Sequence, residues 1–287
     1  MLDAHTPYLL PEGNVQIAFS GGRTSAYMLH QIAEANCGIP ENRAEVIFTN
    51  TGREMPETLD FVAEVSQRWQ IPVTWLEYRR EAPGFEVIGR QAAAENGEPF
   101  DAMIDAKQYL PNVTQRFCTQ ELKLRPAKRY LIARGWPRWT TALGIRADEP
   151  KRIKPEPQKE RWQRWYPLAA AGVTKLHVAS FWKRQPFDLR LPNVKGSCQL
   201  GNCDGCFLKS EWNRAALVRD YQERAAWWEA AEGRIGALET QKGRQKDNAQ
   251  FDKRGSWSDL RTFVQRQGDW VFDTEDSLCQ ADDGECM

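Results

Sequence analysis

One stretch near the start of the chain, VQIAFSGGRTSAYML at residues 15–29, constrains the fold most. An apolar run at 15–20 leads into Ser20-Gly21-Gly22, and a helical pattern over 24–36 follows at once. Adjacent glycines lose much backbone entropy on folding, so they are favoured where the chain turns tightly or a ligand comes close. A turn that opens a helix presents N–H groups and positive dipole charge, which suits phosphate or sulfate. The stretch therefore predicts an anion site, with an ordinary strand-to-helix turn as the alternative.

The same pattern repeats along the first part of the chain. Apolar runs at 45–50 and 71–77 predict two more strands, and Pro56 suits the first turn of a helix between them. This alternation predicts a parallel sheet wrapped by helices, in which ligands bind beyond the carboxyl ends of the strands. Ser20-Gly21-Gly22 and the segment 49–52 both lie at those ends, which favours the anion site.

The later sequence predicts a larger share of helix. Helices are expected at 115–134, with a break near Pro126, and at 174–184, 209–231 and 256–267, the last capped by Ser256 or Ser258. A strand is expected at 139–145 and a mobile, proline-punctuated loop at 150–167. The expected architecture is an α/β domain at 1–172 with a parallel, Rossmann-like sheet flanked by helices, followed by a mostly helical, cysteine-rich region at 173–287.

Charge and cysteine content limit the classes of function. Lys+Arg and Asp+Glu are equal at 39 each, so net charge does not indicate DNA or membrane binding, although 146–164 is basic and 269–287 is acidic. No apolar run approaches the ~20 residues that span a membrane, and MLDAHTPYLL lacks the features of a secretory signal. Seven unevenly spaced cysteines do not resemble an extracellular disulfide framework. The expected location is a reducing cytoplasm, where clustered cysteines indicate metal or redox chemistry.

Four ordered motifs resemble a known family. SGGRTS lacks the spacing of Walker and dinucleotide loops, and is similar to the SGGxxS pyrophosphate loop of the adenine nucleotide α-hydrolase-like (PP-loop) superfamily. FTNTGREMPETLDFV (48–62), RFCTQELKLRP (116–126) and LGIRADEPKR (143–152) resemble segments of the phosphoadenylyl-sulfate (PAPS) reductase family, in the family's order. The sequence departs from many relatives at Arg23-Thr24, where they have Lys-Asp, and at Asn50, where Asp is common.

The resemblance implies roles for particular residues. Phosphate or sulfate oxygens would be bound by Ser20, Gly21, Gly22, Thr24 and Ser25, whereas Thr51 and Gly52 would lie near the ribose and adenine. Lys123, Arg146 and Arg152 would bring positive charge to the anionic end of the ligand, which fits the preference of phosphate for the planar arginine fork. A surface ion pair is the alternative for each cation.

The segment GSCQLGNCDGCFLKS carries three cysteines, Cys198, Cys203 and Cys206, within nine residues. This density favours a metal site. The resemblance to sulfate-activating reductases nominates Cys118 as a further ligand of a [4Fe–4S] cluster, with Cys198 supplying the thiolate that a paired cysteine gives in those enzymes. Structural zinc is an alternative, and so is a [2Fe–2S] cluster with Cys279 or Cys286 as its downstream ligand. Cys37, at an apolar helix end, is expected to be an ordinary buried residue.

Aromatic residues raise a further alternative. Trp162 and Trp165 lie in the basic stretch RWQRWY, which is compatible with base stacking in a nucleic-acid site as well as with core packing. The pair Trp227-Trp228 lies in an expected helix and is interpreted as core.

The leading hypothesis is an enzyme resembling PAPS or adenylyl-sulfate (APS) reductases, with adenine nucleotide as ligand and a thiol reductant such as thioredoxin as partner. The resemblance implies Cys286, in the tail SLCQADDGECM, as the thiol that attacks sulfur, and a solvated acidic chain end is the alternative. If Cys286 has this role, Cys279 is the candidate resolving partner. The alternative is an ATP-dependent PP-loop sulfurtransferase that thiolates nucleic acid. A third hypothesis is a non-catalytic nucleotide-binding module with a structural metal.

Overall fold

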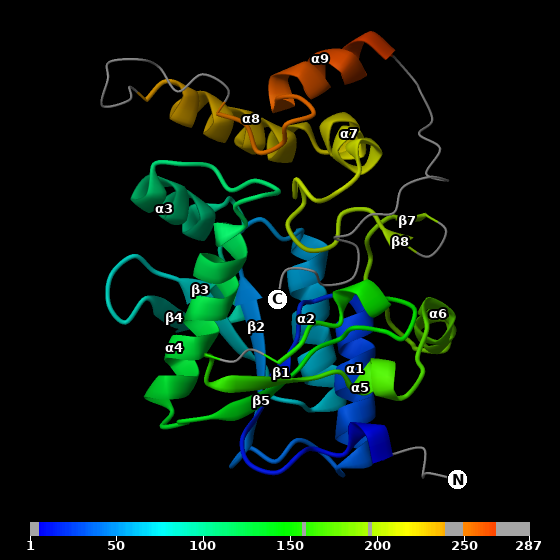
Figure 1. The fold of residues 1–287 in the computed structure, drawn as a ribbon. Helices are drawn as coiled ribbons and strands as arrows, with labels where there is room; N and C mark the ends of the chain where they lie inside the picture. The colour runs from blue at the N-terminus through cyan, green and yellow to red at the C-terminus, as the bar shows by residue number, and fades with distance from the viewer. Residues whose placement is uncertain (1–5, 157–158, 195–196, 239–248, 268–287) are drawn as a thin grey trace.

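The computed structural model describes residues 6–156, 159–194, 197–238 and 249–267 (Figure 1). Its centre is a six-stranded sheet in the order β4-β3-β2-β1-β5-β6. The strands are β1 (Val15–Ala18), β2 (Ala44–Asn50), β3 (Thr74–Tyr78), β4 (Phe85–Ile88), β5 (Trp139–Ala142) and β6 (Trp162–Trp165). All neighbours pair in parallel except β3 and β4. The predicted α/β architecture with a mostly parallel sheet is confirmed.

Helices cover both faces of the sheet, as parallel strands require because they are buried on both sides. The helices of the first part are α1 (Arg23–Ala35), α2 (Pro56–Trp69), α3 (Glu98–Lys107), α4 (Arg125–Ala133), α5 (Pro167–Ala170) and α6 (Lys175–Trp182). Alternate residues of β2 face opposite sides: Phe48 belongs to the core that includes α1 and α2, and Ile47 to a smaller cluster with Leu131 of α4. Every residue of β1 and β2 is buried.

The C-terminal region is helical and carries the cysteines. A short hairpin, β7 (Asn193–Val194) with β8 (Ser197–Cys198), leads to the cysteine loop. The helices α7 (Glu211–Asp220), α8 (Gln222–Gly236) and α9 (Trp257–Gln267) follow, and they lie across the end of the sheet where β2 finishes (Figure 1). Ser256 caps α9, because its hydroxyl accepts a hydrogen bond from Asp259 N at 3.0 Å. In the described part of the chain, no helix is long and apolar enough to cross a membrane.

Several expected elements differ from the structure. The 150–167 segment is not all loop, since it contains the short 3-10 turn η4 (Pro150–Arg152) and the edge strand β6. The expected helix at 209–231 is two helices, because Tyr221 between them adopts an extended φ of −138°. The 119–124 part of the expected helix at 115–134 is a π-helix, η3 (Thr119–Leu124). Strand β4 and helix α3 were not expected, nor were the short turns η1 (Thr6–Tyr8) and η2 (Arg90–Ala92).

Candidate nucleotide and cysteine sites

The SGGRTS loop joins β1 to α1 in a tight turn. Gly21 has a φ of +78°, and a Cβ there would lie 2.7 Å from Thr58 Cγ2 of α2, so no larger residue fits without moving that helix. Gly22 is the N-cap of α1, and no side chain among the described residues caps the helix. A Cβ at Gly22 would meet nothing closer than Ser20 Oγ, at 3.8 Å. The amino end of α1 therefore faces open space, as an anion site requires.

Two serines brace this loop from within. Ser25 Oγ lies 3.0 Å from Ser20 Oγ and accepts a hydrogen bond from Ser20 N at 3.2 Å. Ser25 Oγ also donates to Gly22 O at 3.0 Å. The predicted residues Ser20, Gly22 and Ser25 are thus held together in one preformed turn.

Arg146 reaches this turn from the neighbouring strand. The chain passes from β1 to β2 and β3 on one side and returns to β5 on the other, so the edges of β1 and β5 form the topological switch point where ligands bind in such sheets. Arg146, in the loop after β5, is buried, and its Nη1 donates to Thr24 Oγ1 at 3.3 Å. Asp148 Oδ1 lies 2.9 Å from Arg146 Nε, and this ion pair restricts the orientation of the Arg146 guanidinium. The structure therefore brings together two motifs that are far apart in sequence.

These groups open into one cleft of about 460 Å³, a volume typical of small-ligand sites. We call it the phosphate cleft. It is lined by Ser20, Gly22, Arg23, Thr24, Ser25, Arg146, Lys175, Leu176, Val178, Ala179, Trp182, Lys183, Asp188, Leu189, Asn193, Cys198, Gly201 and Asn202. Cations outnumber carboxylates in this lining, and its one carboxylate, Asp188, accepts two hydrogen bonds from Arg23, at 2.6 and 2.7 Å. The balance of charge favours an anionic ligand.

Five other predicted ligand residues lie outside the lining of this cleft: Gly21, Thr51, Gly52, Lys123 and Arg152. Arg152 forms an ion pair with Glu149, and Glu149 lies 3.7 Å from Arg146 Nε. Arg152 is therefore connected to the phosphate cleft through Glu149 and Arg146. Gly52 packs against α3, where a Cβ would lie 2.8 Å from Pro99 Cδ. Thr51 donates to Glu54 Oε2 at 2.7 Å and lies 3.3 Å from Cys203 Sγ. Contact of Thr51 and Gly52 with a nucleotide remains a prediction.

A second pocket lies on the sheet face covered by α4. Its walls include the stacked rings of Trp139 and Trp162, whose centroids are 5.9 Å apart, and the cations Lys123 and Lys128. Trp162 therefore lies against the core, although RWQRWY also suggested a nucleic-acid surface. The buried ammonium of Lys123 lines both this pocket and the cysteine cavity described next.

Three of the four cysteines predicted to bind metal meet at one small cavity. Cys118, next to the π-helix η3, lines it together with Cys203 and Cys206 of the cysteine loop. The other lining residues are Thr51, Phe100, Thr119, Leu122, Lys123, Phe207 and Trp228. In the described part of the chain, no three side chains of His, Cys, Asp or Glu are close enough to hold a metal ion. The three thiols would have to draw together around one, so the metal site remains a prediction.

The remaining cysteines lie elsewhere. Cys198 lines the phosphate cleft, and it does not line the cavity of the other three. Cys37 is exposed, so the expectation of a buried residue is wrong: it lies in the turn after α1, beyond the helix whose apolar face packs into the core. Cys279 and Cys286 lie outside the described residues.

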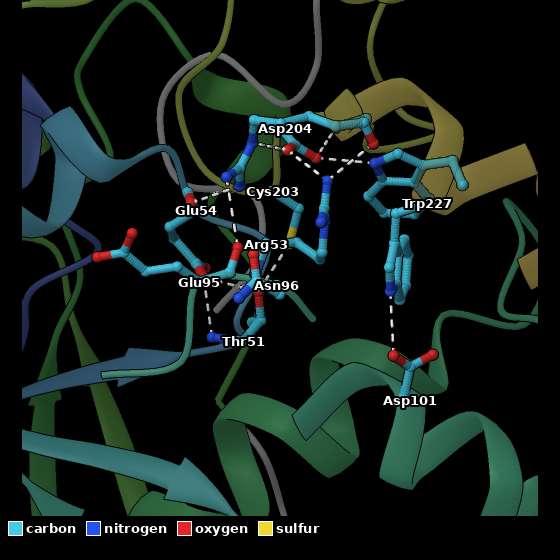
Figure 2. Close-up of polar contacts among 12 residues, drawn as sticks. Thr51, Arg53, Glu54, Glu95, Asn96, Asp101, Cys203, Asp204 and Trp227 are labelled. Atoms are coloured by element: carbon cyan, nitrogen blue, oxygen red, sulfur yellow. Dashed lines mark hydrogen bonds and ion pairs between the residues drawn. The ribbon is translucent and has the colours of Figure 1, made fainter. Parts of the chain in front are cut away.

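A buried ionic hub, consisting of Arg53, Asp204 and Arg224, joins the β2 loop to the cysteine loop. Figure 2 shows Arg53 of the β2 loop beside Asp204 of the cysteine loop. Asp204 is fully buried and accepts from Arg53 Nη2 at 2.7 Å, from Arg224 Nε, and from Trp228 Nε1 at 2.8 Å. Burial lowers the pKa of Arg53, and the Asp204 carboxylate opposes that shift. Sequence reasoning missed this hub; the only signal was an Asp between two of the clustered cysteines.

Backbone contacts strengthen the same junction. Asp204 N donates to Arg53 O at 2.8 Å, and Glu54 pairs with Cys203 in an isolated antiparallel bridge. Gly205 is required here, because a Cβ would lie 2.3 Å from Trp228 Nε1. The position of the cysteine loop is therefore set by the loop that follows β2.

The fold and cleft define an α/β protein with a glycine-containing loop and a cation-lined cleft at its topological switch point. The phosphoadenosine phosphosulfate reductase domain model matches residues 14–186, and the chain belongs to this family. It is also 36% identical over 214 residues to the "Uncharacterized nin region protein ORF290" of Escherichia phage lambda, an alignment covering 71% of this chain and 69% of that protein.

Solved structures show more distant likenesses. PAPS reductase from Candida auris matches with a TM-score of 0.41 and 16% identity, over 59% of this chain and 71% of the other. The U34-tRNA thiolase NcsA from Methanococcus maripaludis matches with a TM-score of 0.43 and 13% identity, over 86% and 83%. Likenesses this distant carry no information about the chemistry of this chain.

Proposed function

We propose that this protein is an enzyme that binds an activated sulfate nucleotide, APS or PAPS, and transfers or reduces its sulfur with a cysteine thiol. The observation that carries the proposal is the phosphate cleft. In a chain of the PAPS reductase domain family, SGGRTS and Arg146 converge there from β1 and β5.

Each part of the nucleotide has a complementary surface. Its phosphate and sulfate oxygens would be held by the α1 amino end, Ser20, Ser25 and Arg146 in the phosphate cleft. Its ribose and adenine would lie near Thr51 and Gly52, in the loop that follows β2 at the same edge of the sheet. Lys123 lines the cysteine cavity together with Thr51 and would carry positive charge beside them.

The donor types of the cysteine cavity suit an iron–sulfur cluster, because thiolates are its ligands and Cys118, Cys203 and Cys206 line one cavity. The cavity measures about 10 Å³, so the cysteine loop would have to move to admit a cluster. A [4Fe–4S] cluster is the preferred interpretation and zinc the alternative. A cluster would supply electron transfer or sulfur binding. The chain itself positions the thiols through the Asp204 hub and keeps them in an apolar cavity lined by Phe100, Phe207 and other residues.

The ligand is tested by isothermal titration of the anaerobically purified protein with APS, PAPS and ATP. We expect tightest binding of APS or PAPS. Tightest binding of ATP, with release of pyrophosphate, would instead support the alternative, a sulfurtransferase.

The site is tested in the same titration with Gly22→Ala. The added methyl group projects into the phosphate cleft and meets no packed atom, so the fold should persist. Nucleotide affinity should fall about tenfold, that is about 1.4 kcal/mol. Gly89→Ala is the matched control, since Gly89 also has open space around it but follows the distant edge strand β4. Equal affinities in the two variants would contradict the proposed site.

A further inference from the structure

Cys198 lies on a strand pair that faces the phosphate cleft. In the β7–β8 hairpin Cys198 is directly opposite Asn193, and opposed residues of an antiparallel pair project from the same face. Both residues line the phosphate cleft, and neither lines the cavity of Cys118, Cys203 and Cys206. The cysteine segment therefore divides its thiols between two cavities.

The cleft that Cys198 lines carries other groups that suit anions. The cleft that Cys198 lines also contains Ser20 and Gly22 of the SGGRTS loop, together with the cations Arg146 and Lys175. A nucleotide whose phosphate oxygens contact the α1 amino end would thus present its anionic end within the same cleft as this thiol.

Two hydrogen bonds hold the segment around Cys198 in place. Gln199 N donates to Pro192 O at 3.2 Å, and the fully buried Lys209 donates through Nζ to Gln199 O at 2.8 Å. A Cβ on Gly201 would lie 3.4 Å from Cys198 Sγ, so the loop folds closely over the sulfur. The thiol is half-buried and positioned, which distinguishes it from the exposed Cys37.

We propose that Cys198 is the thiol that accepts the sulfonyl group of the bound nucleotide, in place of a fourth metal ligand. The inference rests on the proposed function and deepens it, because it assigns the accepting atom to Cys198 Sγ.

The step balances without an external reductant. The Cys198 thiolate forms a bond to the sulfur of the sulfate group, while the bond from that sulfur to the bridging oxygen breaks. The bridging oxygen leaves with the electron pair as the phosphate of the nucleotide. The enzyme retains a cysteine S-sulfonate. A second thiol, from a dithiol reductant, then attacks the cysteine sulfur, forms a disulfide and releases sulfite.

The first experiment is alkylation of the full chain with iodoacetamide, followed by peptide mass spectrometry. The probe is adenosine bisphosphate, the nucleotide that PAPS leaves after it loses its sulfonyl group, at about ten times its Kd. Alkylation of Cys198 should slow about tenfold, because only the unliganded protein reacts. Cys37, beyond the far end of α1, should react at an unchanged rate and serves as the internal control. Equal rates at Cys198 with and without bound nucleotide would overturn the inference.

The second experiment locates the product. After incubation with APS or PAPS in the absence of reductant, the peptide containing Cys198 should gain the mass of one SO₃ group and lose it on addition of dithiothreitol. Cys37→Ser should form the same adduct, and Cys198→Ser should form none. An adduct on Cys286 with Cys198 unmodified would overturn this inference and leave the proposed function standing. Failure of every nucleotide to bind the native protein would contradict the proposed function itself.

Discussion

At the scale of single residues, Asp204 connects the two halves of the candidate site. Its carboxylate is fully buried between two arginines, and its backbone N–H binds the β2 loop. A buried ion pair contributes little net stability compared with apolar packing, but removing one partner leaves the other charge unpaired. Asp204 is therefore more important for holding Cys203 beside Thr51 than for the stability it adds.

We predict that Asp204→Asn lowers the free energy of unfolding by about 3 kcal/mol, because Arg53 and Arg224 would keep buried charge without a counterion. Urea titration followed by tryptophan fluorescence measures the loss. Asp220→Asn is the matched control: its ion pair with Arg219 is exposed, so the change should stay below about 1 kcal/mol. Similar midpoints for the two variants would show that the hub is not needed.

Spacing and glycine content predicted a tight turn at the start of α1, and Ser20, Gly22 and Ser25 lie together in that turn. Their role in binding a nucleotide remains a prediction. Arg53, Asp204 and Arg224 are distant in sequence and meet only through tertiary packing. An arginine or aspartate gives no local sign that its partner will come from another element, and for this reason the hub was missed.

At the scale of elements, local pattern predicted buried strands and amphipathic helices well and boundaries poorly. β1, β2, α1 and α2 follow the expected periodicity. β6 was missed because edge strands carry charged residues that resemble loop sequence, and RWQRWY is such a case. The break at Tyr221 has no proline or glycine to mark it, and it turns α8 so that Arg224 and Trp228 reach Asp204.

The junction of α8 and α9 depends on one buried carboxylate. Glu232 accepts hydrogen bonds from Phe251 N at 3.0 Å and from Trp257 N, at the start of α9, at 2.7 Å. Burial raises the pKa of Glu232 to about 7, although these N–H groups and Arg214 oppose the shift. The folded protein thus holds this proton more tightly than the unfolded chain does.

The consequence is a pH dependence of known sign. The contribution of Glu232 to stability is complete below the unfolded pKa of about 4.5 and is lost as pH rises toward about 7, a change on the order of 3 kcal/mol. We predict that Glu232→Gln flattens the dependence of unfolding free energy on pH over this interval, measured by urea titration at a series of pH values. Parallel curves for the native and variant proteins would contradict this assignment.

At the scale of the whole molecule, the core crosses the expected boundary between residues 172 and 173. Leu29 and Phe61 of the sheet region belong to the same core as Trp182, Phe207 and Trp228. The two-domain division at this point therefore remains a proposal about sequence organisation, whereas the hydrophobic core is continuous. The C-terminal region supplies most of the lining of the phosphate cleft, and it supplies Cys203, Cys206, Phe207 and Trp228 to the cysteine cavity.

We predict that anaerobically purified protein is brown and contains roughly four irons per chain, as a [4Fe–4S] cluster requires. Cys118→Ser, Cys203→Ser and Cys206→Ser should lose the visible absorbance and the iron, because these thiols share the cavity. Cys37→Ser should retain both. Cys198→Ser separates the two assignments of that residue: retained iron supports its place in the phosphate cleft, and lost iron supports its role as the fourth ligand. Stoichiometric zinc without iron would support the structural-zinc alternative.

The wide separation of Cys118 from Cys203 and Cys206 along the chain also bears on biosynthesis. At roughly 5–20 residues per second, Cys118 emerges from the ribosome several seconds before the other two. The cavity that the three share does not exist until the cysteine loop has been made and has docked on the β2 loop through Asp204. Any group held by all three thiols must therefore be inserted after the sheet domain has been translated. A group delivered earlier would find only the Cys118 thiol available.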